Sequence, residues 1–330
     1  MSRSLRPRAC RRSNLLGVLI VALILLTAIL APILALPENP EDPAPFKAVG
    51  ERFDRLPHPP SAGHPLGTTP RRLDIQFKGI AALQADGTSD KPQVDIYYTL
   101  IWGTRSALRL GLLIVSITAV FGVLIGLVSG YVGGAVNGLA MRVTDAFLVF
   151  PVIAGVWLFD RAIFSTFVVS FGQAAEPSLY ETVLQTMDMT PVMLALIAFS
   201  WMPYARIVNA ETERLKLADF VLAARALGAS DRRIIFRHLL PHVVAPAIVI
   251  AARDIGSVVI LESAFTFIGL RGSGAWGVLL AGSRDFVIGM SGNPFTYWWT
   301  FVPVALALIL FSIGWNLLGD ALNSWLNPRH

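Results

Sequence analysis

The sequence has few charged residues and almost no cysteine. Only 15% of its 330 residues are charged, while 54% are hydrophobic; soluble domains average about 25% charged residues. The single cysteine, Cys10, excludes a disulfide framework or a cysteine-based metal site within one chain. His238 and His242 lack a nearby third ligand, and Pro241 is expected to break a helix between them. The composition therefore predicts a polytopic membrane protein without a metal site.

Common catalytic and nucleotide-binding motifs are also missing. The sequence contains no G-x-x-x-x-G-K-[ST] phosphate loop, no H-E-x-x-H and no G-x-S-x-G. We therefore expect this chain neither to hydrolyse ATP alone nor to act as one of those hydrolases. The net charge of +5 is small and unevenly distributed, so nucleic acid is not an expected partner. In a membrane protein, basic residues usually mark cytoplasmic loops.

Six apolar runs are predicted to cross the membrane. The first, Leu15–Leu36, holds 22 uncharged residues, which exceeds the apolar region of a signal peptide and indicates a retained anchor. Five arginines precede it and place the N-terminus in the cytoplasm. The other predicted spans are Ala107–Gly130, Met141–Phe159 with a kink at Pro151 and an interruption at Asp160 and Arg161, Pro191–Tyr204, His242–Ile268 and Phe301–Leu318.

These spans divide the chain into four regions. Residues 1–36 form the cytoplasmic N-terminus and first span, and residues 37–105 form a Pro-rich extracytoplasmic segment expected to be extended or loop-like. Residues 106–320 form a core of five helices, and residues 321–330 a cytoplasmic tail. Within the core, residues 205–241 are predicted to be a cytoplasmic loop, because residues 205–240 hold seven Lys and Arg against four acids. Gly269–Thr296 is predicted to be an outer loop.

Two local patterns predict contacts within the bundle. Gly122, Gly126 and Gly130 are four residues apart, a spacing that lets two helices approach closely in lipid. Arg142 and Asp145 are three residues apart and are predicted to form a local ion pair at the cytoplasmic edge.

The stretch Asp219–Pro241 is a polar helix–turn–helix between two spans. Gly228 suits a helix C-terminus with positive φ, and Ser230 suits the N-cap of a second helix with Asp231 in its first turn. An apolar stripe is expected along the second helix at Ile234, Ile235, His238 and Leu239. The stretch is either an amphipathic loop on the lipid surface or a docking surface for a protein outside the membrane.

Part of this stretch, Ala223–Pro241, resembles the EAA loop of ABC-importer permeases, whose pattern is E-A-A-x-x-x-G followed by I-x-L-P. His238 replaces the isoleucine and Leu222 the acid of that pattern. The resemblance implies that an ATPase subunit docks here, without the salt bridge that the acid can supply. The residues expected at the docking surface are Leu222, Ala223, Ala224, Arg225, Leu227, Gly228, Ser230, His238 and Pro241.

Other motifs are similar to those of the dipeptide/oligopeptide/nickel permease group, specifically its C-type subunit. They cover residues 57–329 and read HPLGT, LIWGTRSAL, GYVGG, MRVTDAFLVFP, LESAFTFIGL, AWGVL and WNLLGD. Two segments are longer than the resemblance implies, Thr69–Thr99 and Asp160–Met189. The implied fold is all-α and polytopic, with six transmembrane helices in the ABC importer type I permease arrangement.

Three ionisable residues, Arg253, Asp254 and Glu262, fall within the fifth predicted span. Because such residues are costly in a membrane, they are expected either to line the translocation path or to pair structurally with a partner subunit. Arg253 and Asp254 are adjacent and so do not face each other on a helix. For Glu262, which lies in the LESAFTF stretch, a structural polar role is favoured over a place in the translocation path.

The function that this resemblance implies is that of a permease subunit of a binding-protein-dependent ABC importer for di- or oligopeptides. Its implied partners are a second permease, two ABC ATPase subunits that bind ATP and Mg, an extracytoplasmic solute-binding protein and the lipid bilayer. The permease itself needs no cofactor. Import of nickel or another small solute is the nearest alternative. A membrane-embedded enzyme using Asp160, Asp254 or Glu262 lacks a nucleophile–base or metal spacing, and an ion-coupled secondary transporter is a further alternative.

Overall fold

The computed structural model describes residues 6–37, 44–49, 56–70, 93–159, 162, 189–270, 272–288, 293 and 295–326, with side chains from Asn14 onward. Within these residues, five helical segments are long and apolar enough to cross a membrane. A sixth is obtained if Gly134–Val149 and Val152–Phe159, which are bent by 89°, form one broken span. The prediction of six spans is consistent with these helices. Asp160 and Arg161 lie outside the described residues.

The described elements are almost all helices. Helix α1 (Arg6–Leu34) precedes a small antiparallel sheet with strand order β1-β3-β2, formed by Ala48–Val49 (β1), Thr68–Pro70 (β2) and Gln93–Asp95 (β3). The helices that follow are α3 (Ile96–Val132), α4 (Gly134–Val149), α7 (Pro191–Ala198), α8 (Met202–Leu215), α9 (Asp219–Ala226), α10 (Asp231–Arg233), the π-helix η2 (Ile234–Leu239), α11 (Leu240–Phe267), α12 (Ala275–Ile288), the 3-10 helix η3 (Trp298–Thr300) and α13 (Val302–Leu326).

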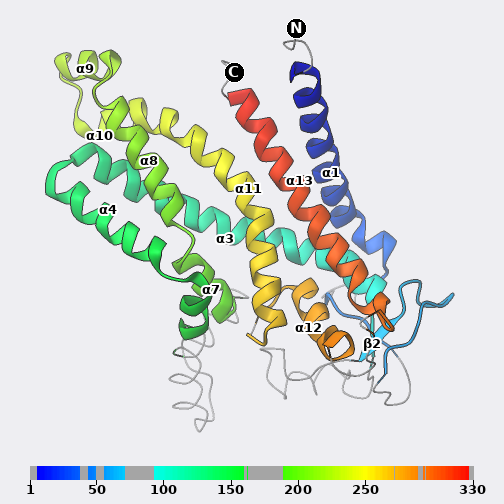
Figure 1. The fold of residues 1–330 in the computed structure, drawn as a ribbon. Helices are drawn as coiled ribbons and strands as arrows, with labels where there is room; N and C mark the ends of the chain where they lie inside the picture. Colours follow the sequence, from blue (N-terminus) through cyan, green and yellow to red (C-terminus); the bar gives the residue numbers. More distant parts are fainter. Residues whose placement is uncertain are drawn as a thin grey trace.

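The molecule has two distinct ends. Figure 1 shows the N-terminus, the C-terminus and α9 with α10 at one end, the termini end. The small sheet and α12 lie at the opposite end, the sheet end, where α12 also contacts β2. The long helices α1, α11 and α13 connect the two ends. Both termini therefore share an end with α9 and α10.

Helix α3 begins at Ile96, well before the predicted span start at Ala107, because Asp95 caps it. The carboxylate of Asp95 accepts a hydrogen bond from the backbone N–H of Tyr98 at 2.9 Å, as an N-cap residue does. The other carboxylate oxygen hydrogen-bonds Nδ1 of His64, in the HPLGT motif, at 2.6 Å. Part of segment 37–105, which was predicted to be extended or loop-like, thus forms a sheet. Asp95, the last residue of strand β3, also caps the membrane helix α3.

The close helix contact predicted from the glycines of α3 is confirmed, and its partner is α8. A Cβ atom on Gly122 would lie 2.4 Å from the carbonyl oxygen of Trp201, and one on Gly126 would lie 2.4 Å from that of Ala205. Any larger side chain at these glycines would push the two helices apart. The side chain of Asn209 on α8 is buried at this contact and donates to Oγ of Ser129 at 2.9 Å.

The third and fourth predicted spans differ from straight helices. The third begins at Gly134 instead of near Met141, and its sharp bend falls at Pro151, as predicted. The fourth continues beyond Tyr204, because α7 and α8 together run from Pro191 to Leu215. The predicted Arg142–Asp145 pair is wrong: Asp145 contacts Arg206 of α8 at 3.1 Å, so the charge joins two helices instead of two turns of one helix.

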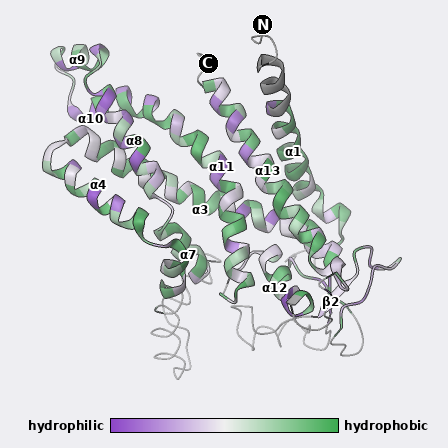
Figure 2. Cartoon of the chain, viewed as in Figure 1, coloured by the Kyte–Doolittle hydropathy of each residue, from purple (hydrophilic) through white to green (hydrophobic). Residues whose placement is uncertain are grey.

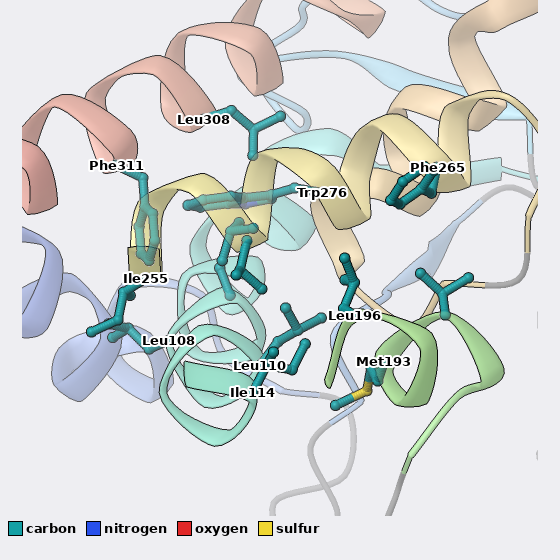
Figure 3. Packing of buried hydrophobic residues seen from close by; sticks show 14 of the residues in the cluster. Leu108, Leu110, Ile114, Met193, Leu196, Ile255, Phe265, Trp276, Leu308 and Phe311 are labelled. Atoms are coloured by element: carbon teal, nitrogen blue, oxygen red, sulfur yellow. The ribbon is translucent and has the colours of Figure 1, made fainter. Parts of the chain in front are cut away.

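The main apolar core lies between α3, α11, α12 and α13. Figure 3 shows Trp276 of α12 among residues of this core, including Ile255, Leu308 and Phe311. The prediction of an outer loop at Gly269–Thr296 is wrong about loop structure for residues 275–288, which form the largely buried helix α12. Helix α12 is shorter than a membrane span and packs against the ends of α3, α11 and α13.

Candidate functional site

The stretch Asp219–Pro241, referred to below as segment 219–241, folds as the predicted helix–turn–helix. Gly228 ends the first helix with φ of +81°, and its N–H donates to the carbonyl oxygen of Arg225 at 3.0 Å. Positive φ is inexpensive only for glycine, which confirms the role predicted for this residue. Ser230 takes the N-cap position before α10, but its side chain makes no capping hydrogen bond.

The prediction that Pro241 breaks the helix is wrong. Residues Asp231–Phe267 form one continuous helical stretch of 37 residues. Proline lacks an N–H donor and its ring crowds the preceding turn of an α-helix. Immediately before it, Ile234–Leu239 adopt wider π-helical turns, which accommodate the ring. The second helix of segment 219–241 is consequently continuous with α11, while α9 is joined to it through the turn at Gly228.

One side of segment 219–241 is anchored in an apolar cluster at the termini end. Val221, Ile234 and Leu239 are fully buried. They share this cluster with residues of three membrane helices, namely Leu127 of α3, Val208 of α8 and Val243 of α11. Burying a side chain of this size contributes about 1.5–3 kcal/mol. The two short helices are therefore attached to three spans at once.

A tyrosine at the end of α3 adds a polar attachment. The hydroxyl of Tyr131 donates to Asp231 Oδ1 at 2.5 Å and accepts from Arg225 Nη2 at 3.2 Å. It thereby contacts both helices of segment 219–241. Sequence reasoning missed this role, although Tyr131 lies in the GYVGG motif; the pattern itself carries no sign of a partner about a hundred residues away.

The opposite side of segment 219–241 exposes apolar residues. Leu227 is 89% exposed, Phe236 52% and Leu222 46%. The remaining predicted docking residues are exposed or half-buried, namely Ala223, Ala224, Arg225, Gly228, Ser230, His238 and Pro241. Figure 2 shows strongly hydrophilic residues around α10, beside this apolar face. An open hollow of about 390 Å³ is lined by Ser230, Arg232, Arg233 and Phe236. A mixed apolar and basic face of this kind can receive a protein partner.

Arg253 and Asp254 point to different helices, as their adjacency predicted. Arg253 forms an ion pair with Asp320 of α13. Gly319 gives it room, because a Cβ atom there would lie 2.5 Å from Cγ of Arg253. Asp254 accepts a hydrogen bond from the hydroxyl of Tyr204 on α8 at 2.7 Å. Both contacts join α11 to another helix of the same chain.

Glu262 lies near the sheet end of α11 and is only 1% exposed. Its Oε1 accepts a hydrogen bond from the backbone N–H of Gly274 at 2.9 Å. The structure thus does not gather the three ionisable residues of the fifth span into one site. Within the described ranges, no three His, Cys, Asp or Glu side chains are placed to hold a metal ion.

Comparison with known proteins identifies the family of this chain. The family described as binding-protein-dependent transport system inner membrane component matches residues 122–330. A dipeptide transport system permease protein of Alkalihalophilus pseudofirmus is 28% identical over 77% of this chain and 75% of its own length. A putative peptide transport system permease protein of Brucella suis is 27% identical over 97% and 88%, respectively. A nickel transport system permease protein of Escherichia coli K12 is 30% identical over 71% and 76%.

Proposed function

Because the chain belongs to the family of binding-protein-dependent transport system inner membrane components, we propose that it forms part of the pore of an importer for short peptides. Chains of this family are inner-membrane permease subunits of ABC importers and have no ATPase activity of their own. ATP and Mg are then bound by partner ATPase subunits. The long apolar helices agree with a multi-pass membrane subunit.

The short-peptide cargo is inferred from relatives named for dipeptide and peptide transport. A nickel transport permease at 30% identity keeps a metal cargo as the second candidate. The assembly that we propose contains a second permease, two ATPase subunits and an extracytoplasmic solute-binding protein. Uptake of a labelled dipeptide, measured beside uptake of nickel in proteoliposomes with all these subunits, distinguishes the two cargoes.

The termini end is proposed to face the cytoplasm. Five arginines precede the first span, and segment 219–241 carries further basic residues at the same end. The sheet end then faces the compartment from which the solute-binding protein delivers its cargo. This orientation makes segment 219–241 accessible to cytoplasmic ATPase subunits.

Docking of an ATPase subunit on segment 219–241 is supported above all by its two-sided construction. Its inner side is buried against three spans, while Leu227 and Phe236 on its outer side remain exposed. A partner that covers these side chains can push on the membrane helices, because the segment is attached to them. Transport by alternating access requires such a link between two sites.

Two substitutions at Leu227 test the docking directly. Leu227→Asp places a charge at the most exposed apolar residue of the face, whereas Leu227→Met keeps an apolar side chain of similar size. Truncating or altering an interface hot spot costs about 2 kcal/mol or more, which is roughly thirtyfold in affinity. We expect the ATPase subunits to copurify with the wild type and Leu227→Met but much less with Leu227→Asp. Equal recovery with all three proteins would contradict docking on this face.

Arg253 and Asp254 remain candidates for the translocation path. The side chain of Arg253 is 43% exposed despite its pairing with Asp320, and Asp254 is only partly buried. Both therefore have surface available to a solute or to the second permease. Glu262 is enclosed and is better suited to a different role.

A further inference from the structure

The carboxyl group of Glu262 occupies a closed space between the end of α11 and the start of α12. Its Oε1 accepts the hydrogen bond from the N–H of Gly274, just before α12 begins. Its Oε2 is buried and has no hydrogen-bond partner among the described residues. A buried polar atom without a partner is costly. A side chain kept here at that cost therefore requires an explanation beyond packing.

Glycines form the walls of this space. A Cβ atom on Gly272 would lie 2.2 Å from Oε1 of Glu262, and one on Gly274 would lie 2.3 Å from Oε2. At Gly274 the three nearest atoms all belong to the carboxyl group itself. The space thus matches a carboxyl group in size, and the hydroxyl of Thr266, which donates to Oε1 at 3.3 Å, borders it beside the two glycines. Glu262, Gly272 and Gly274 are called the glycine socket below.

The start of α12 is also bound to the other helices. The indole N–H of Trp276 donates to the carbonyl oxygen of Leu100 on α3 at 3.1 Å. Its ring occupies the space left by Gly103, where a Cβ atom would lie 2.4 Å from Nε1 of Trp276. On the other side, the ring packs edge-on against Phe311 of α13 at a centroid distance of 5.6 Å (Figure 3). Helix α12 therefore lies where α3, α11 and α13 meet.

One continuous helix connects the glycine socket with segment 219–241. The stretch Asp231–Phe267 runs from the termini end to the sheet end without a break in the described backbone. At about 1.5 Å per residue, 37 residues span roughly 55 Å. This single helical stretch, with Pro246 in its interior, links the first turns to Glu262.

We propose that Glu262 is a positioning residue for transport, whose carboxyl group fastens α12 to α11 so that both move together when an ATPase subunit acts on segment 219–241. This inference rests on the proposed function. Helix α12 then changes its position relative to α1, and opens or closes the path at the sheet end. The attachment needs an acceptor oxygen of the right size and shape, so the uncharged Glu262→Gln should retain it and Glu262→Ala should lose it.

The movement can be measured in the assembled transporter in nanodiscs. Cys10 is first replaced by serine, and spin labels are placed at Asp285, exposed on α12, and Ile33, which is 75% exposed on α1. The distance between the labels is measured without nucleotide and with ATP and vanadate. We expect a nucleotide-dependent shift in the wild type and in Glu262→Gln, and its loss in Glu262→Ala while ATPase subunits still copurify and hydrolyse ATP.

The outcomes separate this inference from the proposed function. A shift in Glu262→Ala equal to that of the wild type overturns the role of the carboxyl group. If Glu262→Gln also loses the shift, the claim that an uncharged side chain of this shape can hold α12 to α11 is overturned. No shift in a wild-type complex that hydrolyses ATP overturns the movement of α12. Failure of the wild type to bind any ATPase subunit overturns the proposed function instead.

A second experiment needs no partner subunit and tests the glycine socket alone. Gly274→Ala adds a Cβ atom against the carboxyl group, so it should lower the thermal unfolding midpoint of the purified permease by several degrees. In the Glu262→Ala background the same change should have little effect, because the obstructing atoms are gone. Equal effects in the two backgrounds overturn the proposed geometry.

Discussion

The two ends of the helix Asp231–Phe267 are built in opposite ways. At the termini end, segment 219–241 exposes apolar side chains, including Leu227 and Phe236. At the sheet end, Gly272 and Gly274 of the glycine socket lie against the polar side chain of Glu262, which is 1% exposed. Each end therefore carries an exception to the usual preference for apolar residues inside and polar residues outside, although both ends also contain buried apolar side chains.

This difference indicates two kinds of attachment. Exposed apolar side chains gain stability when a protein or a lipid surface covers them, and the proposed ATPase contact supplies a partner that binds and acts at the termini end. A buried carboxyl group loses stability if its hydrogen bond breaks, so the sheet end suits an attachment kept throughout the transport cycle. The helix Asp231–Phe267 thus connects a contact that changes during transport, at segment 219–241, to an attachment that does not, at the glycine socket.

The largest expected effect tests the termini end. Gly228→Pro cannot adopt the φ of +81° of this turn and removes the N–H that donates to Arg225. Strain and hydrogen-bond loss of about 1–3 kcal/mol should reduce the coupling of ATP hydrolysis to uptake by roughly 5- to 150-fold. Uptake per ATP hydrolysed in proteoliposomes measures this ratio, and membrane insertion should be unchanged because the turn lies outside the spans.

Gly63→Pro provides the matched control for that substitution. Gly63 lies in the turn that leads into β2, in an open position where a Cβ atom would meet no other atom within 4 Å. We expect its coupling ratio to equal that of the wild type. Normal coupling in Gly228→Pro would show that this turn does not transmit the action of the ATPase.

The turn at Gly228 and the close packing at Gly126 could be predicted from the sequence because each depends on local chemistry. A glycine after a short helix indicates positive φ, and glycines spaced by four indicate a close helix contact. The glycine socket could not be predicted in this way. Glu262 and Gly274 are twelve residues apart, and their contact depends on how α12 folds back, which no local periodicity encodes.

The continuity through Pro241 was missed for a related reason. Proline at this point favours a helix break, and only the π-helical turns before it remove the conflict. Asp145 was likewise assigned to its sequence neighbour Arg142, although packing of α4 on α8 offers Arg206 at 3.1 Å. Local rules thus identified the elements, while the contacts between them required the tertiary structure.

A smaller effect is expected for Tyr131→Phe, which removes one attachment of segment 219–241. Its hydroxyl links Asp231 and Arg225 at an exposed site, so its loss should cost about 1 kcal/mol and lower the coupling ratio roughly fivefold. Tyr97→Phe is the control, since Tyr97 lies in the first turn of α3, directly after β3, and its hydroxyl donates to the carbonyl oxygen of Leu34 at 3.4 Å. If Tyr131→Phe and Tyr97→Phe had equal coupling ratios, the Tyr131 hydroxyl would have no part in coupling ATP hydrolysis to uptake.

The smallest effect is expected for Leu222→Ala, at the position where the EAA pattern has an acid. Leu222 is 46% exposed and has no charge to lose, so its truncation should change uptake by no more than about twofold, as most surface substitutions do. Leu222→Glu restores the acid without changing the buried anchor at Val221. If docking depends on shape and apolar contact, Glu should gain nothing over Leu in ATPase copurification. A clear gain by Glu, or complete loss of uptake in Leu222→Ala, would show that this side chain contributes more to docking than its exposed, uncharged setting indicates.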